Sequence, residues 1–562
     1  MHCRTLLLVT LLLPLLSTLR GQSARDALLH TQTTLTGTAR SLGMGGAFSA
    51  VGADLSTATT NPAGLGVYRS SSVVITPEFN LINTRTDFLD RRQTNTGSAL
   101  RLPSIGVAFS TLNYRNLGGG QRQVVEEGIV SYTFALGYNN LENYNRTTGV
   151  RNAFNPFSSI TDQYAARAEG IPAQDLIAFQ DQAPVTFPEL YWNTFTIDVL
   201  AGSDSSRYFP AVNDGRISQT FQVSESGRRN EWYAAVGANF SNRLFLGGAI
   251  SVQQLRYENT FDFNEDDLDE YHEFYNNDPA FGPLEFPFVS LRFTERFTTR
   301  GTGINGKVGL IYRPNDALRL GLSAQTPTVF SLTDRITRTS LAHTYTGETP
   351  SGQVIDETLE DELGEAEFDY ALYTPFRATA GLMWLLGKKG FLAADLEYVN
   401  YAGANLSSGA TSINDPNATD FSPENEEIDA LYQPALNLRV GGEARVDMFR
   451  LRAGVAYYSS PFTDAGRTYL RLDAPESGDY RNLIGQNPAD LASTQQIDGR
   501  RLFFTLGAAL RQPNFFLDVS LVHQRQQDKY APYTLASDEV FQPTATTLRV
   551  VNRIVASVGF NF

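Results

Sequence analysis

Residues with chemically reactive side chains are few in this chain and widely spaced. The single cysteine is Cys3, so removal of the N-terminus excludes a disulfide framework, a cysteine zinc site and a cysteine nucleophile. The histidines beyond the N-terminus are scattered: His30, His272, His343 and His523. A haem ligand pair or a zinc site needs a more regular grouping, so the sequence indicates neither.

Motifs for nucleophilic catalysis and phosphate binding are also missing. We find no Gly-x-Ser-x-Gly elbow between a strand and a helix, and no phosphate-binding loop. Two acidic runs, 264–273 and 357–369, lack the ligand spacing and turn glycine of a calcium loop, which favours solvated loops. We therefore expect no catalytic residues, no metal and no cofactor, and a protein that is not an enzyme.

The composition is unusual for a soluble protein of 562 residues. Hydrophobic residues make up 42% and charged residues only 19%, below the roughly 25% charged residues of soluble domains. The formal net charge is −15, which argues against nucleic-acid binding because phosphates need clustered lysine and arginine. No Pro- or Gly-rich stretch marks a linker between domains.

The N-terminus has the pattern of a secretory signal peptide over residues 1–21. A short basic start is followed by an apolar run at 6–16 and by small and polar residues up to Gly21, where we expect cleavage. A membrane anchor is the alternative, but the run is shorter than the about 20 residues that a spanning helix needs. The mature protein is therefore expected to be exported.

Apolar and polar residues alternate with period two through most of the remaining chain. Between 547 and 562, for example, Val550, Ile554 and Val558 share one face, and Arg549 and Arg553 lie on the other. A soluble β-sandwich also alternates, but these strands reach about ten residues or more, whereas soluble strands average about five or six. Tight turns, such as the one at Ser241, alternate with long polar loops, which is typical of an outer-membrane barrel.

The pattern predicts an all-β fold, a transmembrane antiparallel β-barrel of about fourteen strands spanning residues 71–562. The long polar loops fall near 264–288, 340–365, 402–430, 460–497 and 527–545. The predicted strands are 71–86, 99–112, 126–143, 216–240, 243–262, 289–313, 316–338, 366–386, 389–401, 432–446, 448–459, 498–511, 514–526 and 546–562.

The last residues carry a second signal. Phe562 ends the chain and Phe560 precedes it at the alternate position, which resembles the C-terminal signature that barrel-assembly machinery recognises. We therefore expect that machinery to be a partner during biogenesis.

Residues 22–70 precede the first strand and do not alternate. Gly43, Gly45 and Gly46 permit tight bends and close approach to neighbours, and Asn61-Pro62 would end a short helical turn over 54–60. A barrel of fourteen strands has a lumen too wide for its own side chains to fill. The segment is therefore expected to act as a hatch, or plug, inside the lumen.

The run ARSLGMGGAFSAVGADLSTATTNPAGLGVYRSS resembles the N-terminal hatch of the long-chain fatty-acid transporter (FadL/TodX) family of outer-membrane proteins. Asn61-Pro62-Ala63 matches the family's NPA motif, and the likeness is closest to a large, poorly characterised branch. The resemblance implies a fourteen-stranded barrel that moves hydrophobic molecules. It also implies a hatch on the periplasmic side and a kink in the third strand that opens a lateral gap toward lipid.

The resemblance assigns expected roles to particular residues. Asn61-Pro62-Ala63 is either a structural helix stop or part of a moving gate, and Gly128 or Gly137 could permit the kink in the third strand. The loop over 144–215 would form part of an extracellular site for a greasy substrate, although its aromatics could instead pack together and close the barrel mouth. Those aromatics include Phe154, Phe157, Tyr164, Phe179, Phe187 and Trp192.

These observations favour a passive outer-membrane transporter for hydrophobic small molecules, such as long-chain fatty acids or other lipophilic compounds, in a Gram-negative bacterium. Substrate would be captured outside, pass a hatch-gated apolar channel and leave sideways. Outer-membrane lipids and lipopolysaccharide are the other expected partners. The alternatives are a surface shuttle or anchor barrel for a protein-secretion system, and a general porin.

Overall fold

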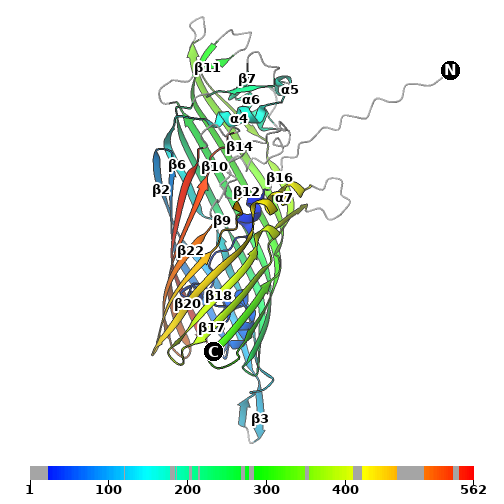
Figure 1. Ribbon diagram of the computed structural model, residues 1–562, viewed down its shortest axis with the longest axis vertical. Coiled ribbons are helices and arrows are strands. Elements are labelled where there is room, and N and C mark those ends of the chain that lie inside the picture. The colour runs from blue at the N-terminus through cyan, green and yellow to red at the C-terminus, as the bar shows by residue number, and fades with distance from the viewer. Residues whose placement is uncertain are drawn as a thin grey trace, which may run out of the picture.

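A closed antiparallel wall forms most of the computed structural model (Figure 1). The structure describes residues 23–118, 121–177, 184, 186–200, 206–212, 215–267, 273–276, 284–348, 354–408, 420–464, 499–535 and 543–562. The expected signal peptide, residues 1–21, lies outside them. Strand β24 pairs with β1 and closes the barrel, starting with Asn561 opposite Ser72.

The wall has fourteen positions, and four of them are occupied by an interrupted strand. The uninterrupted strands are β1 (Ser72–Phe88), β2 (Arg91–Leu112), β9 (Ile217–Phe240), β10 (Leu244–Asp266), β12 (Leu284–Tyr312), β20 (Pro434–Val446), β21 (Phe449–Tyr458), β22 (Arg501–Arg511), β23 (Phe515–Tyr530) and β24 (Ala545–Asn561). The interrupted ones are β5 (Ile129–Asn143) with β6 (Arg146–Asn155), β13 (Leu318–Gln325) with β14 (Val329–Glu348), β17 (Arg377–Leu385) with β16 (Ala366–Tyr373), and β18 (Gly390–Asn400) with β19 (Asn405–Ser408). Pro327 and Pro375, which have no backbone N–H, lie at two of the interruptions.

The prediction of a transmembrane β-barrel with about fourteen strands is confirmed. The expected loop over 340–365 is instead largely strand, because β14 pairs with β15 (Val354–Leu363). The expected loop over 264–288 contains β11 (Glu273–Asn276), which pairs with the start of β12. The connection between β2 and β5 also departs from the tight-turn pattern, since it carries a hairpin of β3 (Tyr114–Gly118) and β4 (Gln121–Val124).

Apolar side chains cover the outer face of the wall on its tight-turn side. On β10 the outward residues Leu246, Ile250 and Val252 are exposed, whereas the outward positions beyond them, starting at Gln254, are polar. Exposed apolar residues continue around the barrel on other strands, including Leu438, Val440, Leu451, Phe504, Leu506 and Leu521. An apolar belt of this extent belongs in lipid, and the wall continues beyond it with a polar outer face.

The chain ends at the tight-turn side of the barrel (Figure 1). The backbone N–H of Phe562 donates to the carbonyl of Ser71 at 3.0 Å, which ties the last residue to the start of β1. Phe560 and Phe562 are exposed, so their rings remain accessible on the outer face. Their role as an assembly signal stays a prediction.

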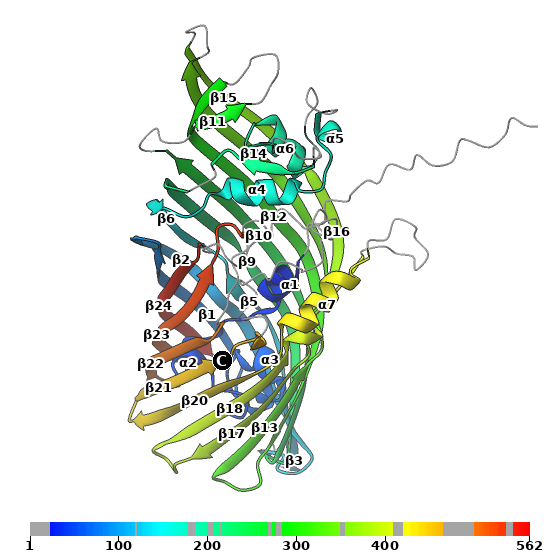
Figure 2. The same cartoon turned by 45° about the horizontal axis from the view of Figure 1, so that its top comes forward.

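Residues 23–67 lie inside the barrel rather than in its wall, and we call them the luminal segment (Figure 2). The segment contains α1 (Ala24–Thr31), α2 (Ala39–Leu42), α3 (Thr57–Thr60) and η1 (Pro62–Val67). Ser23 and Asp26 form a capping box that starts α1, because each accepts the other's backbone N–H, at 3.4 and 3.1 Å. Among the described residues, no helix is both long and apolar enough to cross a membrane.

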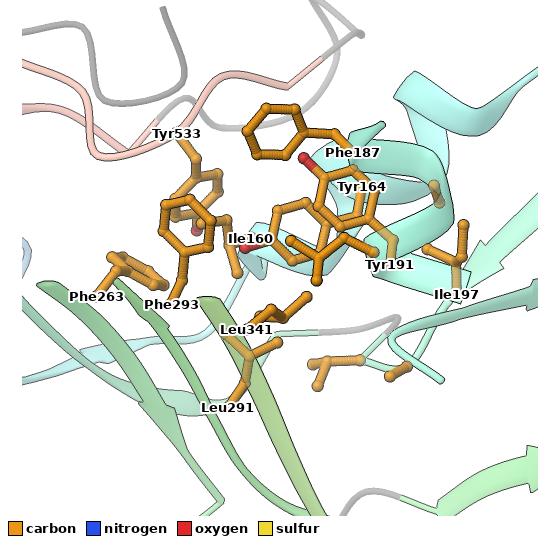
Figure 3. Packing of buried hydrophobic residues seen from close by; sticks show 14 of the residues in the cluster. Ile160, Tyr164, Phe187, Tyr191, Ile197, Phe263, Leu291, Phe293, Leu341 and Tyr533 are labelled. Carbon is orange, nitrogen blue, oxygen red and sulfur yellow. The ribbon is translucent and has the colours of Figure 1, made fainter. Parts of the chain in front are cut away.

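The connection between β6 and β9 crosses the long-loop end of the barrel (Figure 2). It contains α4 (Ile160–Ala168), α5 (Ala173–Ile177), α6 (Phe187–Asn193), β7 (Ile197–Val199) and β8 (Tyr208–Pro210). Its apolar side chains pack against wall residues such as Phe263, Phe293 and Leu341, and we call this cluster the mouth core (Figure 3). The buried carboxylate of Glu265 on β10 accepts the backbone N–H of Ile160 at 2.9 Å, which fixes the start of α4 to the wall.

Candidate functional site

The backbone of the luminal segment comes very close to the wall at positions where the wall carries glycine. An ideal Cβ on Gly247 would lie 2.3 Å from the carbonyl carbon of Pro62 and 2.4 Å from the nitrogen of Ala63. Glycines of several neighbouring strands make equally close approaches to the segment, and we call them the wall glycines: Gly237, Gly247, Gly309, Gly321, Gly381, Gly441 and Gly454. Only residues without a side chain let two backbones come this close.

Asn61, Pro62 and Ala63 are completely or almost completely buried at this contact. The side-chain amide of Asn61 donates to the carbonyl of Ser49 at 2.7 Å and to that of Leu310 on β12 at 3.2 Å. Its Oδ1 accepts the backbone N–H of Ala63 at 3.2 Å, which caps η1. The motif thus ends α3, starts η1 and binds the wall. Whether it also moves as a gate stays a prediction.

Gly43, Gly45 and Gly46 form a turn that presses against another part of the wall. Gly45 and Gly46 have φ angles of 64° and 74°, which favour glycine. The backbone N–H of Gly45 donates to the hydroxyl of Thr505 on β22 at 2.9 Å. These predicted hatch residues therefore lie at a fixed contact between the luminal segment and the wall.

Arginines of the wall bind the extended part of the luminal segment. Arg553 donates to the carbonyl of Leu35 at 2.8 Å, and Arg377 donates to that of Thr31 at 2.5 Å. Arg229 donates to the carbonyls of both His30 and Gln32. Because a guanidinium has five N–H donors and no acceptor, it suits a row of backbone carbonyls that no strand pairs.

Buried ion pairs inside the lumen join several of the other charged side chains there. Arg452 reaches Glu443 at 2.8 Å and Asp518 at 2.5 Å, and Arg40 of the luminal segment reaches Glu443 at 3.5 Å. Arg439 pairs with Glu397. Through Arg40, these ion pairs link the luminal segment to the wall, and Arg445 at the exposed rim also lies 3.8 Å from Glu443.

The wall loses its backbone pairing between β2 and β5 partway along the strands. Pairing ends at Ser104 opposite Asn139, next to Pro103, which has no N–H to donate. Strand β5 then shifts its register against β9 between Asn140 and Glu142. Strand β6 contacts β2 through side-chain hydrogen bonds, such as that from Asn95 to the carbonyl of Gly149 at 3.4 Å. We call the facing stretches 96–103 and 140–148 the unpaired wall. Leu100 within it is 79% exposed.

A cavity of about 60 Å³ lies behind the unpaired wall and beside the luminal segment. This exceeds the about 15 Å³ that one water molecule requires. Its lining is mostly polar, with one carboxylate, Glu142, and three aliphatic residues, Leu29, Ile82 and Val551. The neutral polar residues of the lining are Gln32, Thr34, Asn80, Asn143, Asn145 and Gln524. Its basic lining consists of Arg101, Arg146, Arg501, Arg549 and Arg553. We call it the arginine cavity.

Some guanidinium groups of the arginine cavity have unused donors. The buried Nε atoms of Arg501 and Arg549, together with Nε and Nη2 of Arg553, have no hydrogen-bond partner among the described residues. A buried donor without a partner is costly, more so on a charged group. The cavity therefore suits a small anionic group, and only Leu29, Ile82 and Val551 offer an aliphatic contact to a hydrocarbon attached to it.

The aromatic residues predicted for ligand capture fall into two groups. Tyr164, Phe187 and Trp192 are buried in the mouth core, as the packing alternative describes, and Tyr164 stacks on Tyr191 at 3.9 Å (Figure 3). Phe154 and Phe157 are exposed. Phe179 lies outside the described residues.

The two glycines predicted for a strand kink lie outside the unpaired wall, although Gly137 is only three residues from it. Gly128 has a φ of 75° and precedes β5, close to a register shift between Ile129 and Ser131. Gly137 lies within the paired part of β5, and an ideal Cβ there would meet the hydroxyl of Tyr233 at 2.3 Å. Gly137 therefore makes room for that ring.

Sequence reasoning missed the residues of the unpaired wall and the arginine cavity. One local signal was available, because Pro103 interrupts an otherwise alternating strand. The inward arginines of β22 and β24 carried no signal of their own, since charged residues alternate with apolar ones along any barrel strand.

His30 of the luminal segment leads to a pH prediction. It is fully buried edge-on against Tyr144 and Tyr257, with both ring nitrogens unpartnered among the described residues. Burial, aided by Arg229 and Arg25, lowers the pKa of His30 to about 3.

In the unfolded chain the His30 ring takes up a proton near pH 6.5, whereas the buried ring stays neutral down to about pH 3. The contribution of neutral His30 to the free energy of unfolding is therefore complete above pH 6.5 and is lost as the pH falls toward about 3. We expect His30→Phe to reduce this loss. The test is the temperature at which each protein loses the gel mobility of its folded form, measured at about pH 7 and at about pH 4 for the wild type and the variant. Equal pH dependence in both proteins would contradict it.

Comparisons with known proteins give structural matches only. No protein-family model matches the chain. No curated protein matches it either. A Pseudomonas aeruginosa FadL homologue is 14% identical, with a TM-score of 0.49, and the alignment covers 94% of this chain and 99% of that one.

Two toluene transporters are also similar. TodX of P. putida is 12% identical, with a TM-score of 0.44 and coverage of 94% of this chain and 99% of that one. TbuX of Ralstonia pickettii is 12% identical, with a TM-score of 0.42 and coverage of 93% and 98%.

The architecture itself decides the class of protein. The wall is closed, because each of its positions pairs with a neighbour on both sides over at least part of its length, and its outer face carries an apolar belt. The chain is a membrane-spanning antiparallel β-barrel of the outer-membrane type, with residues 23–67 folded into the lumen.

Proposed function

We propose that this chain is a FadL-like outer-membrane transporter for the passive uptake of hydrophobic small molecules. Its substrates carry a long apolar part and a small anionic end, as fatty acids do. The observation that carries the proposal is the arginine cavity. It is lined by buried guanidinium groups with unused N–H donors, and it lies beside an unpaired stretch of the wall.

The position of the unpaired wall supports sideways release. Phe79 on β1 lies opposite Leu100 on β2, and both are exposed at the level of the apolar belt. A molecule that leaves the arginine cavity here meets lipid instead of water. An apolar molecule gains nothing from an aqueous pore, and the lipopolysaccharide leaflet obstructs its direct passage.

The filled lumen argues against a general porin. The luminal segment contacts the wall glycines in the lower part, and the mouth core occupies the upper part. In this proposal the luminal segment, with Asn61-Pro62-Ala63 as its wall contact, is the hatch that moves during transport.

The binding step can be tested on the barrel purified from outer membranes in mild detergent. We expect Arg501→Gln with Arg549→Gln to weaken binding of a fluorescent long-chain carboxylate by about 100-fold or more, because two hydrogen bonds to charged groups are lost and each contributes about 1.5–3 kcal/mol. Binding of the corresponding methyl ester should change little, since the ester has no charge.

The matched control is Arg445→Gln with Arg525→Gln, which removes two exposed arginines from the same part of the chain. It should leave carboxylate binding unchanged. Native mass spectrometry of the wild-type barrel adds a second readout, since a retained lipophilic anion is expected. Equal binding of acid and ester by the wild type would contradict an anion site, and a retained protein partner would favour the shuttle alternative.

A further inference from the structure

Three arginines stand side by side on the outer face of the barrel. Arg256 on β10 lies directly opposite Arg228 on β9 and directly opposite Arg300 on β12. All three side chains are exposed, and they occupy outward positions of adjacent strands. We call them the arginine row.

The arginine row lies just beyond the apolar belt. Trp232, Val252 and Ile304 form an equivalent row on the same strands, and each is exposed. The arginine row follows four residues later, which corresponds to about 13 Å along a strand and about 10 Å across the membrane at a tilt of about 40°. This distance places the arginine row near the outer edge of the lipid headgroup region. The long arginine side chains can reach from there back to the headgroups.

The charges of the row are not neutralised by the protein. Among the described residues, no carboxylate lies within ion-pair distance of Arg228, Arg256 or Arg300. The nearest acidic residue along β10, Glu258, is 4.0 Å from Arg296 instead.

Some other exposed arginines of the outer wall do have acidic partners. Arg92 pairs with Asp87, and Arg335 with Glu365. Like charges placed directly opposite each other destabilise a sheet. Three adjacent arginines are therefore unfavourable by themselves, and an anionic partner would stabilise them. They form a local basic patch in a chain whose net charge is −15.

We propose that the arginine row binds the phosphate groups of an outer-leaflet glycolipid, the lipid A part of lipopolysaccharide. Guanidinium groups bind phosphate through two parallel N–H···O bonds, and three adjacent groups can serve a headgroup with two phosphates. The acyl chains of the same molecule would lie on the Trp232–Val252–Ile304 row. This site rests on the proposed outer-membrane location but not on transport.

The test measures lipid A binding by native mass spectrometry, with purified diphosphoryl lipid A added to the folded barrel in detergent. The variant is Arg228→Gln, Arg256→Gln and Arg300→Gln together. Each arginine near an anionic lipid surface contributes about a factor of five, so the triple variant should bind about 100-fold more weakly. Monophosphoryl lipid A should bind the wild type less well than the diphosphoryl form.

The charge-matched control is Arg85→Gln, Arg92→Gln and Arg335→Gln, which removes three exposed arginines that have acidic partners. It should bind lipid A like the wild type. Gel mobility before and after heating shows that every variant is folded. Undiminished lipid A binding by the first variant, or an equal loss in the control, would overturn the proposal. Competition by free inorganic phosphate as strong as that by lipid A would also overturn it, because it would indicate a simple anion site.

Discussion

Replacing Gly247 with valine is expected to detach the luminal segment from the wall and make the barrel conduct ions. The new Cβ would stand 2.3 and 2.4 Å from backbone atoms of Pro62 and Ala63. Backbone cannot swing aside as a flexible side chain can, so the Asn61-Pro62-Ala63 turn has to leave its place. Overpacking of this kind costs about 1–3 kcal/mol or more.

The neighbouring glycine provides a matched control. An ideal Cβ on Gly248, which faces outward, has only the carbonyl oxygen of Lys307 nearby, at 3.8 Å. Gly248→Val adds the same side chain to the same strand, and we expect it to behave like the wild type. The measurement is the conductance of single barrels in planar bilayers, with gel mobility as the check on folding.

We expect conductance steps in Gly247→Val that are absent from the wild type and from Gly248→Val. Gly309→Ala is a milder second variant, because its methyl group meets the side chain of Asn61 rather than backbone. An unchanged, closed barrel in both inward variants would show that the wall glycines do not hold the segment.

The wall strands could be predicted from the sequence because their signal is local. Each strand within the apolar belt faces lipid on one side, so period-two alternation marks its ends within a few residues, as for β20 and β21. Beyond the belt the outer face is polar, so the apolar lipid-facing positions that mark a strand within the belt are lost. This is why β15 and the upper part of β14 were expected as a loop.

The site could be predicted only in part, because its central features depend on pairing between distant segments. The luminal position of residues 23–67 follows from the width of the barrel and from the resemblance around Asn61. The arginine cavity does not follow in this way. Arg501 and Arg549 reach it from two strands, and only the end of the β2–β5 pairing leaves it beside the unpaired wall.

The second large effect is expected at Asp395, an inward residue of β18 that is 2% exposed. Its carboxylate accepts the backbone N–H of Phe48 at 2.8 Å, the backbone N–H of Ser49 at 3.0 Å and the Ser49 hydroxyl at 2.6 Å. Across the strand pair lies Gly381, where any side chain would collide with Ser49. The wall thus forms a socket for this turn of the luminal segment.

Asp395→Ala should lower the free energy of unfolding by about 3 kcal/mol or more, because three donors lose their acceptor and each buried unsatisfied donor costs about 1–3 kcal/mol. Asp395→Asn keeps an acceptor oxygen in the socket and should lose less. Urea unfolding of the barrel in detergent measures both. Equal stability of the alanine and wild-type proteins would rule out the socket as an anchor.

The combined behaviour of the two sites also bears on gating. Gly247 holds the turn at Asn61-Pro62-Ala63, whereas Asp395 holds the turn at Phe48-Ser49, and the amide of Asn61 links the turns through the carbonyl of Ser49. If the segment moves as one body, loosening either contact should admit ions, and Asp395→Ala should conduct as well. If only Gly247→Val conducts, the mobile part of the segment is confined to the Asn61 turn, and Phe48-Ser49 is its fixed end.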